Sequence, residues 1–101
     1  MRKINLAKYD VEIGGEMKPY DVKASVISIM FSEHMKHTSQ ALMDYSDIKE
    51  KIKKAEDSVI LEDAEFSKIL NAVDTFQGFR EIDLEFVKRI KNAETIDPNA
   101  K

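Results

Sequence analysis

The chain has 101 residues, of which 43% are hydrophobic and 35% are charged. This length and composition are typical of one globular domain and exclude a disordered chain. The formal net charge of -3, from 16 basic and 19 acidic residues, disfavours a general nucleic-acid binder, because such proteins need a basic surface to displace counterions. Since the chain contains no cysteine, disulfides and thiolate metal sites are excluded as well.

Neither a membrane-spanning helix nor a signal peptide is predicted. No apolar run reaches the roughly 18 residues that a membrane-spanning helix needs. The N-terminal stretch MRKINLAKYDVEI has no continuous apolar segment behind its basic residues, as a signal peptide would. We therefore expect a cytoplasmic protein whose residues 1–101 form a single domain.

Residues 2–20 are predicted to form a β-hairpin. Apolar side chains recur near period two along INLAKYDVEI, with one slip at residues 7–8 that a bulge would explain. Gly14-Gly15 predicts the turn, because glycine adopts a positive φ without steric cost. The return strand follows at once and reaches Pro19, which lacks an N–H group and must therefore lie at the end or edge of the strand.

Residues 21–93 are predicted to be helical, with four helices at about residues 22–31, 38–55, 62–76 and 81–93. The first of them, VKASVISIMF, is apolar almost all round, which indicates a buried helix capped by Asp21. Its β-branched residues leave a strand open as the alternative. Gly78 follows the third helix, as expected for a C-cap, and Leu42 is placed on the apolar stripe of the second.

The remaining segments complete an α+β fold with an N-terminal β-hairpin packed on a bundle of about four α-helices. Residues 59–61 are predicted to be a short extended link, with a strand beside the hairpin as the alternative. Residues 94–101 are predicted to be a loose tail. The seam between the last two helices is predicted from their apolar stripes, and it comprises Phe66, Leu70, Val73, Phe86 and Ile90.

The stretch SEHMKHTSQ contains both histidines of the chain, His34 and His37, with Glu33 before the first. Histidines three apart on a helix can chelate one ion, but a zinc site needs three or four ligands. No spacing in the sequence identifies the others. We therefore interpret His34 and His37 as part of a polar joint between two helices, with a metal site as the alternative. No catalytic residue and no cofactor are predicted.

Two kinds of residue are candidates for an interface. The acidic segment 57–74 is interpreted as a solvated surface, with Glu62 and Glu65 in a first helical turn; a patch that meets a basic partner is the alternative. Leu84 and Met43 lie off the apolar stripes of their helices. Exposed apolar residues are often without consequence, but these two could mark a partner surface together with Met30, Phe31 and Met35.

Residues 59–93, chiefly through the motifs LEDAEF, FQGF and EFVKRIKNAE, resemble the C-terminal part of small proteins encoded by bacterial phages and prophages. The opening YDVEIGGEMKPYDVK is similar in style to the same group. The motifs are helix-start and core patterns and cover about a third of the chain. Many proteins of this group have no assigned activity, so the resemblance carries no catalytic residue over to this chain.

We therefore expect a non-enzymatic, phage-encoded protein-interaction factor of the bacterial host cytoplasm, which helps virion assembly or modulates a host protein. Its partner is expected to be another protein of phage or host; self-association stays open, and neither a membrane nor a nucleic acid is expected. One alternative is a nucleic-acid-associated regulator that would use the basic residues Lys49, Lys51, Lys53, Lys54, Lys88, Arg89 and Lys91. The other is a small metal-dependent enzyme.

Overall fold

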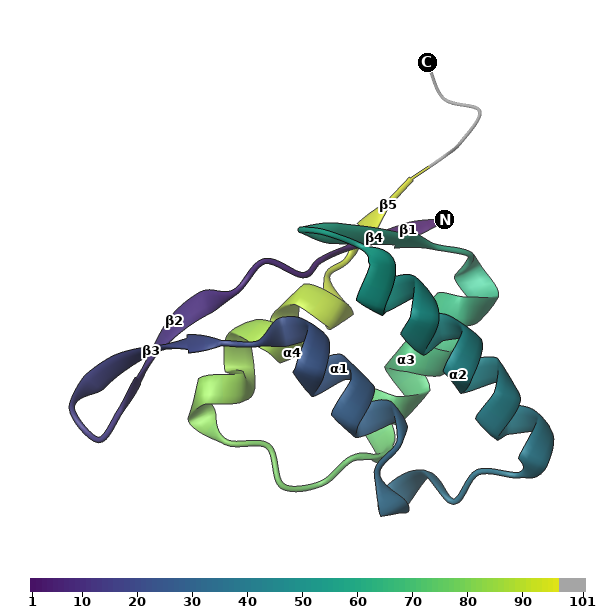
Figure 1. Cartoon of the computed structure of the whole chain (residues 1–101), viewed down its shortest axis with the longest axis horizontal. Helices are drawn as coiled ribbons and strands as arrows, with labels where there is room; N and C mark the ends of the chain where they lie inside the picture. The colour runs from purple at the N-terminus through teal and green to yellow at the C-terminus, as the bar shows by residue number, and fades with distance from the viewer. Residues whose placement is uncertain (97–101) are drawn as a thin grey trace.

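The structure is a computed structural model that describes residues 1–96. Its elements, in chain order, are β1 (Arg2–Asn5), β2 (Tyr9–Ile13), β3 (Glu16–Tyr20), α1 (Val22–Met30), the 3-10 helix η1 (Glu33–Met35), α2 (Ser39–Lys54), β4 (Ser58–Leu61), α3 (Asp63–Thr75), the 3-10 helix η2 (Glu81–Asp83), α4 (Leu84–Lys91) and β5 (Glu94–Thr95). The fold is α+β, as predicted: a β2–β3 hairpin projects from a body of four helices, and a small sheet lies at one end of that body (Figure 1).

The first twenty residues do not form one hairpin, and this prediction was wrong. β1 is instead the central strand of an antiparallel sheet of order β4-β1-β5. The slip at residues 7–8 is a break between two strands and not a bulge: Asn5 Oδ1 accepts a hydrogen bond from the Ala7 N–H (2.9 Å). Leu6 N–H then donates to the Asp57 carbonyl (2.8 Å), which ties the break to the start of β4.

The same sheet decides two further predictions. Residues 59–61 belong to β4, which is the strand alternative, although its partner is β1 and not the hairpin. Residues 94–101 are not loose throughout, because Glu94–Thr95 form β5, which pairs with β1 on the side opposite β4. Residues 97–101 lie outside the described part of the chain.

The hairpin itself is a two-stranded ribbon with a two-residue turn. Gly14 and Gly15 have φ values of 60° and 83°, as the two central residues of a type I′ turn require. The turn sets the register, in which Ile13 pairs with Glu16 and Tyr9 pairs with Tyr20. The glycine pair was therefore identified correctly as a turn, and the hairpin is shorter than predicted.

α1 is a helix, so the strand alternative for residues 22–31 is wrong. Asp21 caps it, with its Oδ1 accepting from the Ala24 N–H at 3.0 Å. The face that packs inward carries Val22, Val26, Ile29 and Met30, all buried. α1 packs against both α2 and α3, which explains why its sequence is apolar almost all round.

Other helix details differ from the predicted pattern. α3 ends at Thr75, and its C-cap is Phe76, whose N–H donates to the Ala72 carbonyl; the C-cap is therefore two residues before Gly78. The last helix is two elements, η2 and then α4, because Asp83 turns its side chain back to the backbone N–H of Arg80. Leu42 is 48% exposed and does not belong to the apolar stripe of α2.

One hydrophobic cluster joins the small sheet, the hairpin base and all four helices. Four of the five predicted seam residues are buried, namely Phe66, Val73, Phe86 and Ile90. Leu70 is only half-buried, and its neighbour Ile69, 1% exposed, takes the inner position. The phase of α3 is shifted because its inner face must contact α1 as well as α4.

No helix within residues 1–96 is both long enough and apolar enough to cross a lipid bilayer.

Candidate protein-interaction groove

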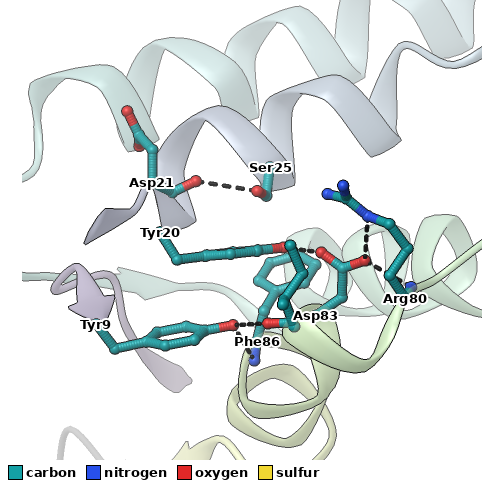
Figure 2. A network of polar contacts seen from close by, with 8 residues as sticks. Tyr9, Tyr20, Asp21, Ser25, Arg80, Asp83 and Phe86 are labelled. Atoms are coloured by element: carbon teal, nitrogen blue, oxygen red, sulfur yellow. Dashed lines mark hydrogen bonds and ion pairs between the residues drawn. The ribbon is translucent and has the colours of Figure 1, made fainter. Parts of the chain in front are cut away.

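A network of polar contacts fastens the hairpin to the junction of η2 and α4 (Figure 2). The rings of Tyr9 and Tyr20, a directly paired couple in the hairpin, stack with their centroids 4.7 Å apart. The Tyr9 hydroxyl donates to the Ile82 carbonyl (2.9 Å) and accepts from the Phe86 N–H (3.1 Å). Both strands of the hairpin are therefore bonded to a segment more than sixty residues further along the chain.

Asp83 is the centre of this network and is only 8% exposed. Its Oδ1 accepts from the Tyr20 hydroxyl at 2.5 Å, and its Oδ2 accepts from the Arg80 N–H at 2.7 Å. The Arg80 Nε lies 3.7 Å from the same Oδ2. Because both carboxylate oxygens have partners within the fold, we assign Asp83 a structural role and not a chemical one.

The two tyrosines give the protein an alkaline limit to its stability. Burial is the main cause that raises the pKa of both hydroxyls above the ordinary value of 10.0, and the hydrogen bond to Asp83 raises the pKa of Tyr20 further. Above pH 10 the unfolded chain loses these protons while the folded protein keeps them, so the free energy of unfolding falls as the pH rises.

We expect Tyr20→Phe to flatten this alkaline decline. One tyrosine contributes a slope of up to about 1.4 kcal/mol per pH unit, and the variant removes the contribution of Tyr20 while that of Tyr9 remains. Urea unfolding of both proteins between about pH 9 and 11 measures the difference in slope. Parallel declines in the two proteins would show that Tyr20 titrates alike in the folded and unfolded states.

An open groove runs beside this network, between β2 and the η2–α4 junction. Its walls are Tyr9, Asp10, Val11, Glu12, Gly14 and Gly15 on one side and Glu81, Ile82, Leu84, Glu85 and Lys88 on the other. Consecutive residues of β2 line it and none of β3 does. Since successive side chains of a strand point to opposite faces, the groove follows the outer edge of β2 and not one face of the hairpin.

The chemistry of the groove is acidic with an apolar contribution. Four carboxylates line it, those of Asp10, Glu12, Glu81 and Glu85, against the single ammonium group of Lys88. Leu84, 52% exposed, stands among them. Two further apolar side chains are exposed at the hairpin tip, Ile13 at 43% and Met17 at 66%.

The other sequence candidates for an apolar partner surface do not gather here. Met43 is exposed, beside Leu42, in the N-terminal part of α2. That end of α2 lies on the opposite side of the molecule from the hairpin and the start of α4 (Figure 1). Met30 is fully buried in the core. Phe31 and Met35 are partly buried and pack against that core, so the five residues do not form one surface.

Glu62 and Glu65 lie at the start of α3, where the side chain of Glu65 makes contacts that stabilise the fold. Its Oε1 accepts from the Glu62 N–H at 3.0 Å, and its carboxylate lies 2.7 Å from the Lys51 ammonium group on α2. These contacts satisfy a helix N-terminus and join two helices. A role of this pair in binding a basic partner stays a prediction, and a charge reversal at Glu65 would disturb the fold as well.

Both histidines lie in the connection between α1 and α2, where the joint interpretation places them. His34 is in η1 and its ring meets the edge of Phe76. His37 follows Lys36, whose φ is 48°, so the two histidines do not share one helix face. Within residues 1–96, no group of three or more His, Asp or Glu side chains is placed to hold a metal ion.

The two histidines should contribute unequally to stability. His37 Nε2 lies 2.5 Å from the Met30 carbonyl and its ring centroid is 4.5 Å from that of Tyr45. We expect His37→Ala to lower the free energy of unfolding by about 1–2 kcal/mol, the usual size of one hydrogen bond with one ring contact. His34→Ala, at an exposed position, should stay within about 0.5 kcal/mol. Thermal and urea unfolding of both variants measures this, and equal effects would contradict it.

Three of the seven basic residues that a nucleic-acid surface would use have carboxylate partners. Lys51 pairs with Glu65, and Lys91 pairs with Asp74. Arg89 pairs with Glu85 at 2.9 Å, donates to the Ala7 carbonyl at 2.5 Å and lies over the Tyr9 ring. Lys88 stands in the acidic groove. Carboxylates therefore stand beside the basic side chains at these positions, which weakens the attraction of a phosphate backbone there.

No protein-family model, curated protein or solved structure matches this chain.

The groove was missed in the sequence because its two walls are seventy residues apart. A local signal did exist: acidic and apolar residues alternate along YDVEI, which is typical of a strand with one polar face. The partner wall carried a signal as well, since Leu84 was identified as off its stripe. Only the tertiary contacts of Tyr9 and Tyr20 bring the two together.

Proposed function

We propose that this protein is a non-enzymatic interaction factor that binds another protein through the groove between β2 and the η2–α4 junction. One observation carries the proposal: an exposed leucine, Leu84, stands in an acidic groove that follows the free edge of a strand. Exposed apolar groups with a polar rim are typical of surfaces that bind other proteins.

The hairpin is held in place before any partner arrives. The stacked tyrosines, the bonds to Asp83 and the contact of Arg89 with the hairpin base all join it to α4. A preorganised surface loses little conformational freedom on binding, and more of the contact energy then appears as affinity. In this proposal, the polar network holds the two walls of the groove in fixed positions relative to each other.

The resemblance to small phage and prophage proteins supplies the biological setting. In that setting the partner is a virion component during assembly or a protein of the bacterial host, and the interaction takes place in the host cytoplasm. These remain predictions. The groove supports protein binding more than nucleic-acid binding, because four of its five charged side chains are carboxylates and would repel phosphates.

Leu84→Ser is expected to weaken partner binding without unfolding the protein. Truncating an interface residue of this kind commonly costs about 2 kcal/mol, a factor of roughly thirty in affinity, whereas an exposed position changes stability by less than about 0.5 kcal/mol. The measurement is capture of partners from a lysate of the native host on immobilised protein, with quantitative mass spectrometry. Thermal unfolding of the same preparations verifies the fold.

Met43→Ser is the matched control, since Met43 is also exposed and apolar but belongs to the N-terminal part of α2, an end of that helix that lies on the opposite side of the molecule from the hairpin (Figure 1). If the groove binds the partner, the Met43→Ser protein should capture the same proteins as the native chain, whereas the Leu84→Ser protein should not. Loss of partner capture by the Met43→Ser protein alone would mean that the interaction surface lies on α2 and not at the groove. Unfolding of Leu84→Ser would show that Leu84 belongs to the core.

A further inference from the structure

We infer that the occupant of the groove is an extended segment of a partner protein, with basic and apolar residues in alternation, which adds to β2 as a third strand of the hairpin sheet. The inference rests on the proposed function and names the chemistry of the partner. It follows from which backbone groups of the hairpin are free, which side chains stand beside them and how the two edges of the hairpin differ.

The outer edge of β2 has unpaired backbone groups. A type I′ turn closes its hairpin with a hydrogen-bonded pair, here Ile13 with Glu16. Bonded and non-bonded pairs then alternate, so the N–H and C=O groups of Asp10 and Glu12 point away from β3. Within residues 1–96, no backbone hydrogen bond joins these two residues to an element outside the hairpin. Two donors and two acceptors thus face the groove.

The outer edge of β3, in contrast, is blocked against the addition of a strand. Its outward positions are Met17 and Pro19, opposite Glu12 and Asp10. Proline has no N–H group and is a common means of blocking a sheet edge. Strand addition is therefore directed to β2, the edge that the groove follows.

The side chains around β2 define the pattern of the incoming strand. Asp10 and Glu12 share one face of β2, because they are two residues apart. Tyr9 and Val11 share the opposite face, which is turned toward η2 and α4, since Tyr9 bonds to that junction. A third strand would place alternate residues beside the two carboxylates, which favours lysine or arginine there. Its other residues would meet the apolar side of the groove.

A second copy of this chain is a poor occupant. Antiparallel pairing of two β2 edges about Val11 would set Asp10 of one copy opposite Glu12 of the other, twice over. Like charges directly opposite each other destabilise a strand pair. The charge of the edge therefore selects a basic segment from a different protein, consistent with the additional carboxylates of Glu81 and Glu85 across the groove.

The test uses a synthetic peptide of alternating lysine and valine, about eight residues long so that it spans the five residues of β2. Binding of the fluorescein-labelled peptide is measured by fluorescence anisotropy at about 0.05 M and 0.15 M salt. A peptide of the same composition with lysines and valines in separate blocks is the composition control. The alternating peptide is expected to bind at least about tenfold more tightly.

Backbone methylation separates strand pairing from charge attraction. Alternate residues of an extended peptide direct their N–H groups to opposite edges, so methylating the lysine nitrogens blocks one edge and methylating the valine nitrogens blocks the other. Strand addition uses one edge alone, and one isomer should lose at least about tenfold in affinity relative to the other. Equal affinities of the two isomers, strong or weak, would overturn the inference.

Charge reversal locates the site. Asp10→Lys with Glu12→Lys should reduce peptide affinity at least about tenfold, whereas Asp47→Lys with Glu50→Lys, the same charge change at exposed positions of α2, should not. Equal loss with the two variants would mean attraction by net charge and would overturn the inference. So would a dimer of the native chain, seen by analytical ultracentrifugation, that competes with the peptide.

The two proposals can fail separately. If lysate capture depends on Leu84 but the peptide does not bind, the protein is an interaction factor with a different kind of partner segment. If the peptide binds at β2 and capture is indifferent to Leu84→Ser, the groove accepts a strand but does not carry the interaction of the native protein, and the proposed function fails.

Discussion

Replacing Phe86 with alanine is expected to lower the free energy of unfolding by about 3–5 kcal/mol, the usual range for a buried phenylalanine. Phe86 is completely buried. The centroid of its ring lies 6.0 Å from that of Tyr20 and 6.5 Å from that of Phe79. The ring therefore fills the space between three segments: the base of the hairpin, the loop that follows α3, and α4 itself. The vacated volume cannot collapse easily, because three separate segments form its walls.

Urea unfolding followed by circular dichroism measures this effect, and Leu84→Ala is its matched control. Leu84 lies on the same helix two residues earlier and is half-exposed, so its truncation should change stability by less than about 0.5 kcal/mol. A loss of under about 1 kcal/mol for Phe86→Ala would mean that α4 does not pack as the structure has it. A domain of this size has a total stability of roughly 5–15 kcal/mol, so the expected loss is a large share.

The second large effect is expected at Asp83. Asp83→Ala leaves the Tyr20 hydroxyl and the Arg80 N–H without their acceptor, and an unsatisfied buried donor is more costly than a lost contact. We expect the free energy of unfolding to fall by about 2–4 kcal/mol at neutral pH. The Arg80 ion pair adds little, because that guanidinium is largely exposed.

A double-mutant cycle with Tyr20→Phe separates the hydroxyl bond from the rest. Tyr20→Phe removes the donor and keeps the ring, so Asp83→Ala should be less damaging in that background. Urea unfolding of the four proteins gives the coupling free energy, expected at about 1–3 kcal/mol for a hydrogen bond to a charged group. Additive effects would show that the 2.5 Å contact between Tyr20 and Asp83 does not stabilise the fold.

The Asp83 variant also bears on the proposed function. The variant removes the bond of Tyr20 to Asp83, and the bonds of Tyr9 then remain to hold the strands of the hairpin to η2 and α4, so the hairpin is held less firmly. Peptide affinity at β2 should then fall even under conditions where most of the chain is folded, because the two walls of the groove are held less rigidly in place. Hydrogen exchange of the β3 amides provides the independent measure of a loosened hairpin.

Local patterns were enough to identify most elements of the fold. Asp21 was recognised as a helix cap, and its side chain accepts the N–H group of Ala24. The predicted start of the second helix at about residue 38 agrees with the cap at Thr38, whose side chain accepts the Ala41 N–H. Gly14-Gly15 was recognised as a turn, because two consecutive residues with positive φ are strongly selected for glycine. Each of these signals lies within four residues of chain, where a side chain satisfies its own backbone.

The errors arose where the partner of a segment is distant in the sequence. Residues 2–5 have the period of a strand whether they pair with β2 or with β4, and period two does not identify a partner. The tail was predicted loose because nothing nearby binds it, yet Glu94–Thr95 pair with β1 from the far end of the chain. Leu70 and Ile69 are equally apolar, and only contacts with α1 and α4 decide which one is buried.

The sequence by itself determined the α+β class, the starts of the first three helices, the hairpin turn and the position of Leu84 off its apolar stripe, because periodicity, capping and turn chemistry are local properties. The tertiary structure alone decided that Leu84 lines a groove with β2, that Pro19 closes one hairpin edge while the other stays free, and that Asp83 is buried and bonded to Tyr20. The physical reason is that a groove and an open strand edge consist of relations between segments. Such relations follow from the packing of the whole core, which no single stretch of sequence records.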